Sequence, residues 1–338
     1  MHCKRLVCLT VAALVGMAGT ALTGTALAAG TLSGAGSTLV APLEAEWAQG
    51  FLARDGVTVN YDAVGSGTGI ADISSRLVDF GASDAPLTPA QAAGCHGCVQ
   101  IPWALSATGV GYNVAGVRGL HLSGGVLAGI YLGQITNWDS PKIAALNRGV
   151  RLPNLKITPI FRSDGSGDTY AFTNYLSHIS GQWAHSVGTA TSVSFPAGVG
   201  GKGNSGVTAI LESTDGSIAY VAVSYLIAHA LPAAAIRNAD GKFEYPNLAN
   251  IENAAQTIKH VPAGNALSIV DPPKGAKIAY PISTFTYAIV PQHPAQAALL
   301  KQWILYAMGS GQSFGPSLDF AKIPSVVLNA GKRTVATL

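Results

Sequence analysis

Apolar and polar residues alternate with period two along some parts of this chain and with the period of a helix along others. The alternation of Val57, Val59 and Tyr61 with polar residues predicts a half-buried strand. The segment LKITPIF at 155–161 predicts another strand, and GSIAYVAVSYLIA at 216–228 predicts a strand followed by a helix. Strand and helix patterns alternate throughout, which favours the α/β fold class.

Three segments share one design, in which a short strand leads into a turn of small residues and then into a helix. The turns are GAGST at 34–38, GSGTG at 65–69 and SDGSGD at 163–168. The apolar residues that follow at helical spacing are Leu39, Leu43, Trp47 and Phe51 after the first turn, Ile70, Ile73 and Leu77 after the second, and Phe172, Tyr175, Leu176 and Ile179 after the third.

Each of these turns is a place where an anion could bind. The first N–H groups of a helix have no partner within the helix, and they lie at the positive end of the helix dipole. The simpler interpretation is that each Ser or Thr only caps its own helix. Three such turns together, one of them next to Arg162, favour a shared oxyanion site.

The first 28 residues are expected to be a secretory signal peptide. Lys4 and Arg5 provide a positive start, an apolar run extends to about Leu22, and cleavage would follow Ala28 or Ala29. A membrane anchor is the alternative, but the run is short and contains Gly and Thr. We therefore expect a periplasmic protein.

Composition sets limits on the class of protein. The 338 residues are 48% hydrophobic and 11% charged, which indicates a globular chain of about two domains. Loss of Lys4 and Arg5 with the signal peptide lowers the formal charge from +3 to +1. No charged tail points to nucleic acid as a partner.

Cys95 and Cys98 lie three residues apart in a turn. In a secreted chain this spacing favours a local disulfide. A redox-active dithiol and half of a zinc site are the alternatives. A zinc site needs about four ligands, and the mature sequence has no second cysteine pair.

Sequence motifs for covalent or metal catalysis are missing. The chain has neither a GxSxG nor an HExxH motif, and Lys202 is followed by Gly203 where a phosphate loop needs Ser or Thr. GSGTG has the wrong spacing for a dinucleotide site. We expect a binding protein without enzyme activity, cofactor or bound metal.

At the level of whole motifs, the chain resembles the family of periplasmic phosphate-binding proteins of the phosphate-specific ABC transporter, which are type II solute-binding proteins. The segments that carry the resemblance are GAGSTLVAPLEAEWA, VNYDAVGSGTGIADI, VDFGASDAPLT, IYLGQITNWDSPKIAALN, FRSDGSGDTYAFTNYL, VGGKGNSGV and YPISTFTYAIV, in the family's order. The resemblance implies two α/β lobes, each a mixed sheet flanked by helices, joined by two crossover strands around a ligand cleft. Lobe one would be residues 30–109 plus 284–338, and lobe two residues 110–283.

The resemblance also implies a set of phosphate-binding residues. The matching positions are Thr38, Leu39, Ser66, Asp84, Arg162, Asp164, Ser166, Gly167 and Asp168. Among them, Thr38 and Ser66 would donate hydroxyl groups, Arg162 would pair with the phosphate charge, and Asp164 would orient Arg162. Leu39, Ser166 and Gly167 would act as donors at the starts of helices.

Asp84 and Asp168 bear on selectivity. A carboxylate beside an oxyanion is repulsive unless a proton lies between them, so Asp84 would accept protonated phosphate and reject fully ionised sulfate. Asp168 stands where the family often has Thr. It lies either in the first turn of its helix, turned from the ligand, or in the cleft as a second acceptor beside Asp84.

The resemblance therefore implies a monomeric receptor that binds phosphate and delivers it to a membrane ABC permease. A receptor for another tetrahedral oxyanion, such as arsenate, is one alternative. A secreted phosphatase with a similar phosphate cradle is another, although the sequence shows neither a nucleophile nor metal ligands for it.

Overall fold

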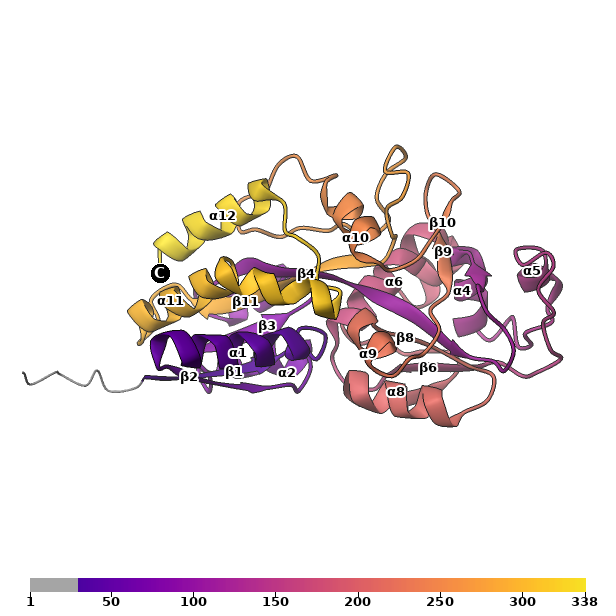
Figure 1. Cartoon of the computed structure of the whole chain (residues 1–338), viewed down its shortest axis with the longest axis horizontal. Coiled ribbons are helices and arrows are strands. Elements are labelled where there is room, and N and C mark those ends of the chain that lie inside the picture. The colour runs from indigo at the N-terminus through magenta and orange to yellow at the C-terminus, as the bar shows by residue number, and fades with distance from the viewer. Residues whose placement is uncertain (1–29) are drawn as a thin grey trace, which may run out of the picture.

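The computed structural model describes residues 30–338, so the expected signal peptide at 1–28 lies outside the described residues. Two lobes lie side by side, and one strand, β4 (Cys98–Asn113), runs through both (Figure 1). Within the described part, one mixed sheet has the strand order β2-β1-β3-β11-β4-β8-β6-β7, and a smaller sheet has the order β10-β9-β5. The α/β class and the two-lobed architecture are confirmed.

The first lobe, at the left of Figure 1, is a sheet covered by helices on both faces. Its elements are β1 (Thr31–Gly36), α1 (Ala41–Asp55), β2 (Thr58–Asp62), α2 (Ser66–Ser74), β3 (Phe80–Ser83), α3 (Pro89–Gly94), β11 (Ser283–Pro291), α11 (Ala297–Ala307), the 3-10 helix η1 (Ser310–Leu318) and α12 (Ser325–Ala336). Strands β1, β2 and β3 are parallel, and β11 is antiparallel to β3. Trp47, Trp103 and Trp303 meet edge to face in its core.

The second lobe contains the remaining strands and helices. They are β5 (His121–Leu122), α4 (Gly124–Tyr131), α5 (Pro141–Ala144), β6 (Thr158–Arg162), α6 (Gly167–Ile179), α7 (Gly181–Ser186), β7 (Val199–Gly201), α8 (Gly203–Ser213), β8 (Ser217–Ala222), α9 (Val223–Ala228), β9 (Ala235–Arg237), β10 (Phe243–Glu244) and α10 (Leu248–Ala255). Phe172 packs against Tyr131 and Tyr220 in its core, which anchors α6 to the sheet.

The chain passes between the lobes at two adjacent places. Strand β4 pairs with β11 as far as Ala107, opposite Ser283, and pairs with β8 from Thr108 onward. The second passage lies just before β11, where the Ile282 carbonyl accepts a 3.0 Å hydrogen bond from the Thr108 N–H. A hinge motion of the lobes would therefore be concentrated at these two neighbouring segments.

One stretch inside the range predicted for lobe two contacts lobe one instead. The Asn265 side chain donates to the Gln100 carbonyl of β4 and to the Thr334 hydroxyl of α12, both at 2.8 Å. The Leu267 N–H donates to the Tyr287 hydroxyl of β11 at 3.1 Å. The residue limits given above for the two lobes stay a prediction.

The predicted elements agree with the structure at β2, β6, β8 and α9. The helix after GSGTG was predicted to bury Leu77 together with Ile70 and Ile73, and this prediction is wrong for Leu77. Helix α2 ends at Ser74, before the turn that would have placed Leu77 on the buried face. The side chain of Leu77 is 72% exposed. Arg76, with a φ of 57°, takes the chain out of the helical path.

Cys95 and Cys98 form the expected disulfide. None of the helices in residues 30–338 is long and apolar enough to cross a membrane.

Candidate functional site

The three turns singled out in the sequence meet between the two lobes. Residues 37–39 and Ser66 come from lobe one, and the start of α6 comes from lobe two. The Gly167 N–H of α6 donates to Ser66 Oγ at 3.1 Å, and the Gly67 N–H donates to the Gly165 carbonyl at 2.9 Å. A Cβ added at Gly167 would collide with Asp84, so this close approach of the lobes requires glycine.

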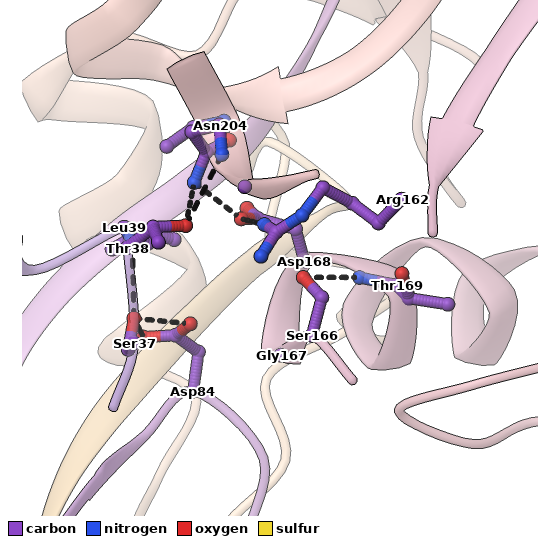
Figure 2. Close-up of polar contacts among 12 residues, drawn as sticks. Ser37, Thr38, Leu39, Asp84, Arg162, Ser166, Gly167, Asp168, Thr169 and Asn204 are labelled. Carbon is purple, nitrogen blue, oxygen red and sulfur yellow. Dashed lines mark hydrogen bonds and ion pairs between the residues drawn. The ribbon is translucent and has the colours of Figure 1, made fainter. Parts of the chain in front are cut away.

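Asp84 follows β3 and is completely enclosed among hydroxyl groups. Ser37 Oγ lies 2.7 Å from Oδ1 and 2.6 Å from Oδ2 of Asp84 (Figure 2). Thr286 Oγ1 donates to Oδ1 at 2.7 Å. Burial, together with the nearby charge of Asp168, raises the pKa of Asp84 to about 7, against the opposing effect of the hydroxyl donors. This carboxyl group can therefore change its protonation near neutral pH.

Ser37 is a site residue that the sequence analysis missed. Its hydroxyl donates to Asp84 and accepts hydrogen bonds from the N–H groups of Leu39 at 3.0 Å and Val40 at 3.4 Å. The Leu39 N–H, expected to bind the ligand, is thus directed at Ser37. The position of Ser37 inside the Gly-Ser-Thr turn was the signal that could have identified it. Thr286, in the middle of β11, carried no such signal.

Arg162 is the last residue of β6, and its side chain is almost fully buried between two carboxylates. Nε and Nη2 pair with Asp164 at 2.8 and 2.5 Å, and Nη1 pairs with Asp168 at 3.1 Å. Burial alone would lower the pKa of Arg162, but the two carboxylates raise it. Burial alone would raise the pKa of Asp164, but the Arg162 hydrogen bonds lower it. The guanidinium is therefore fixed in one plane and stays charged.

Asp168 lies in the first turn of α6, and its carboxylate points into the protein (Figure 2). Oδ1 accepts from the Thr108 hydroxyl at 2.7 Å, and Oδ2 accepts from Asn204 Nδ2 at 2.8 Å and from Arg162 Nη1. Burial raises the pKa of Asp168, and Arg162 opposes that effect. Three of about four acceptor positions on this carboxylate are occupied by donors of the same chain. The buried Asp168 carboxylate is therefore placed to orient the Arg162 guanidinium.

Asn204, near the start of α8, is a second residue that the sequence analysis did not assign. Its N–H and Nδ2 donate to Thr38 Oγ1 at 3.3 and 2.8 Å, and Nδ2 also donates to Asp168. Its Oδ1 accepts from the Ala222 N–H at 2.9 Å. Asn204 thus links lobe two to lobe one. Because Thr38 accepts both bonds, its hydroxyl proton remains free to be donated.

The capping interpretation holds at one of the three turns. Ser166 Oγ accepts from the Thr169 N–H at 3.4 Å and caps α6, and the Ser166 N–H donates to the Thr191 carbonyl at 2.8 Å. Neither Thr38 nor Ser66 caps its helix, although Ser37 accepts the N–H groups of Leu39 and Val40 just before α1. The hydroxyl groups of Thr38 and Ser66 therefore lie between the lobes, where they contact Asn204 and Gly167. Among the residues described, no group of three or more His, Cys, Asp or Glu side chains could hold a metal ion.

Comparison with known proteins identifies the family to which this chain belongs. A model of the PBP superfamily domain matches residues 21–310. The phosphate-binding protein PstS of Xylella fastidiosa is 34% identical over 298 residues, covering 87% of this chain and 81% of the relative.

Two solved structures share the fold. A high-affinity periplasmic phosphate-binding protein bound with phosphate has a TM-score of 0.72 and 20% identity, covering 90% of this chain and 93% of the other. An ABC-type phosphate transport receptor from Vibrio cholerae has a TM-score of 0.57 and 20% identity, covering 87% and 100%. The chain therefore belongs to the PBP superfamily and, within it, to the family of PstS phosphate-binding proteins.

Proposed function

We propose that this protein is a periplasmic receptor for inorganic phosphate, that it delivers phosphate to an ABC permease, and that it is not an enzyme. The observation that carries the proposal is the buried carboxyl of Asp84 against the start of α6, surrounded by hydroxyl and N–H donors from both lobes. An acceptor among anion donors suits an oxyanion that still carries a proton. The names of the relatives support the same ligand.

Each predicted site residue has a role in this proposal. Thr38 and Ser66 donate hydroxyl protons, and Arg162 donates the two guanidinium N–H groups left over from its contacts with carboxylates. The Leu39 and Gly167 N–H groups, which point at Ser37 and Ser66 in this structure, would have to share their hydrogen bonds with phosphate to act as donors. The remaining residues shape the site: Asp84 accepts the phosphate proton, Asp164 and Asp168 orient Arg162, and Ser166 fixes the start of α6.

Ligand binding would favour the closed arrangement of the lobes. Thr38, Ser66 and Asp84 belong to lobe one, whereas Arg162 and Gly167 belong to lobe two. A buried phosphate needs nearly all of its oxygen atoms hydrogen-bonded, because an unmet buried charge is costly. Only closure around the passages at β4 and β11 would bring both sets of donors to one anion.

Calorimetric titration of chelator-treated protein with phosphate, sulfate and arsenate tests the proposal. We expect tight phosphate binding without added metal and sulfate binding at least about a hundredfold weaker, since sites built around one hydrogen bond strongly reject ligands that lack it. In Asp84→Asn the sulfate-to-phosphate affinity ratio should rise, because an amide can donate to an unprotonated oxygen. An unchanged ratio would remove Asp84 from this role.

Two alternatives are decided by the same preparation. Arsenate has the geometry and protonation of phosphate, and its affinity in the titration shows whether the site distinguishes the two. A phosphatase with this cradle would release phosphate from a phosphomonoester, and turnover that is abolished by Arg162→Ala would contradict the proposal that the protein only binds.

Light scattering tests whether the protein is a monomer, and stimulation of permease ATPase activity by the phosphate-loaded protein tests delivery.

A further inference from the structure

The two sulfur atoms of the Cys95–Cys98 disulfide differ in their access to solvent. Cys95, just after α3, is fully buried, whereas Cys98, the first residue of β4, is partly exposed. His96 and Gly97 between them have φ values of 46° and 87°. A reagent approaching from outside therefore reaches the sulfur of Cys98 before that of Cys95.

The guanidinium of Arg76 lies against both sulfur atoms. Its Nη1 is 3.7 Å from Cys95 Sγ and 3.4 Å from Cys98 Sγ. Nη2 donates to the carbonyls of Cys95 at 3.0 Å and His96 at 3.3 Å, and Nη1 donates to the Ile73 carbonyl at 2.7 Å. Within residues 30–338, no carboxylate forms an ion pair with Arg76. Its positive charge is thus held beside the disulfide without a counter-ion.

Cys98 also forms part of the wall of a cavity of about 520 Å³. The other walls come from the start of β4, from residues 261–265 and from α12. Leu87, Ala92, Val261 and Pro262 contribute apolar surface beside the polar groups of Gln100 and Asn265. The volume is in the range that accommodates a small organic ligand.

We propose that Cys95–Cys98 is a thiol-exchange site, at which a small peptide thiol of the glutathione class enters this cavity and attacks Cys98 Sγ. The attacking thiolate forms a mixed disulfide with Cys98, and the bond between Cys98 and Cys95 breaks. The electron pair of that bond passes to Cys95 Sγ, which leaves as a thiolate beside Arg76. A second thiolate then attacks the mixed disulfide, releases Cys98 as a thiolate, and departs as the oxidised small disulfide.

Arg76 favours each of these steps. A cation beside a cysteine stabilises the thiolate, and a more stable thiolate is a better leaving group in thiol–disulfide exchange. Because Arg76 contacts both sulfur atoms, it stabilises the reduced pair relative to the neutral disulfide. Arg76 also fixes the turn through its bonds to the carbonyls of Ile73, Cys95 and His96, so the test must measure the redox equilibrium and not only folding.

Equilibration of the folded protein with reduced and oxidised glutathione tests the proposal. The reduced fraction is measured by alkylation and mass spectrometry for the wild type, Arg76→Gln, Arg76→Lys and, as a control, Arg148→Gln, an exposed arginine of lobe two. We expect Arg76→Gln to lower the equilibrium constant for reduction about tenfold, the effect of one unit in thiol pKa. Arg76→Lys should restore part of the loss, and Arg148→Gln should match the wild type. Identical titrations of the wild type and Arg76→Gln would overturn the proposal.

A second measurement keeps the test valid if Arg76→Gln does not fold. In Cys95→Ser the remaining Cys98 thiol should form a mixed disulfide with glutathione, and its alkylation rate should report a pKa below the ordinary value of about 8.5. In Cys98→Ser the buried Cys95 should react much more slowly. Faster reaction at Cys95, or an ordinary pKa for Cys98, would contradict the assignment.

Discussion

Replacing Asp84 by Asn is expected to stabilise the ligand-free protein, and the gain should grow with pH. Burial raises the pKa of Asp84 to about 7 in the folded protein, whereas an Asp in an unfolded chain titrates near about 3.9. Between these values the folded protein holds a proton that the unfolded chain has released. Its contribution to stability is fully present in acid and is lost as the pH rises through about 7.

The size of the effect follows from the distance between the two pKa values. Each pH unit between them lowers the free energy of unfolding by about 1.4 kcal/mol relative to a side chain that does not titrate. The accumulated loss is roughly 1–2 kcal/mol at pH 5 and roughly 4 kcal/mol at pH 8. The charge of Asp168 contributes to the shift, so these figures are upper estimates. An amide does not titrate in this range, so Asp84→Asn should gain roughly 2–3 kcal/mol more stability at pH 8 than at pH 5.

The surroundings can accept an amide at this position. Its oxygen would take the place of Oδ1, which accepts from Ser37 and Thr286. Its NH₂ group would take the place of Oδ2, 2.6 Å from Ser37 Oγ and 3.5 Å from Ser66 Oγ. The substitution therefore keeps the volume and most of the hydrogen bonds, so the removed charge dominates the expected change.

Denaturant unfolding in phosphate-free buffer at pH 5 and pH 8 measures the effect. Phosphate must be absent, because a ligand that binds the folded state adds its own stabilisation. Asp139→Asn, at an exposed carboxylate of lobe two, is the matched control. Its free energy of unfolding relative to the wild type should be the same at both pH values. If the gain of Asp84→Asn were the same at pH 5 and pH 8, the inferred pKa of Asp84 would be wrong.

Three further predictions concern the surroundings of the site. Asp168→Thr should weaken phosphate binding about tenfold, because it frees Arg162 Nη1. Its phosphate affinity should vary with pH in parallel with that of the wild type, and diverging pH profiles would identify Asp168 as a second acceptor. Asn204→Ala should also weaken phosphate binding about tenfold, because it removes bonds between the lobes, and equal affinities measured by calorimetry would contradict this. The double variant Cys95→Ser, Cys98→Ser should keep phosphate affinity within about twofold, since no predicted site residue contacts the disulfide; a large loss would count against it.

Local patterns in the sequence were enough to predict several elements, among them β2, β6, β8 and α9, and the three turns. Strand alternation and helical spacing depend on neighbours within one or two turns of chain, and both can be read without the fold. Family motifs then supplied the two-lobed architecture. Leu77 was misplaced because helix length depends on where the backbone leaves the helix, and Arg76 gave no local signal for that change.

The residues that complete the site were harder to predict, because their contacts join distant parts of the chain. Ser37 and Thr286 lie 47 and 202 positions from Asp84, and Asn204 lies 166 positions from Thr38. No periodicity relates positions so far apart. Asp168 illustrates the same limit, because its neighbour Thr108 is on a strand 60 positions away.

The balance of charge explains why those neutral residues matter for an anion. The single positive charge of Arg162 is already met by Asp164 and Asp168, so the three side chains together are negative before any ligand enters. Asp84 adds no further repulsion only when a proton lies between its carboxylate and the phosphate, as the proposed function requires. Net attraction for phosphate must then come from hydroxyl groups, N–H groups and the dipole of α6. These act over short distances, so the site would select its ligand by hydrogen-bond geometry more than by long-range attraction.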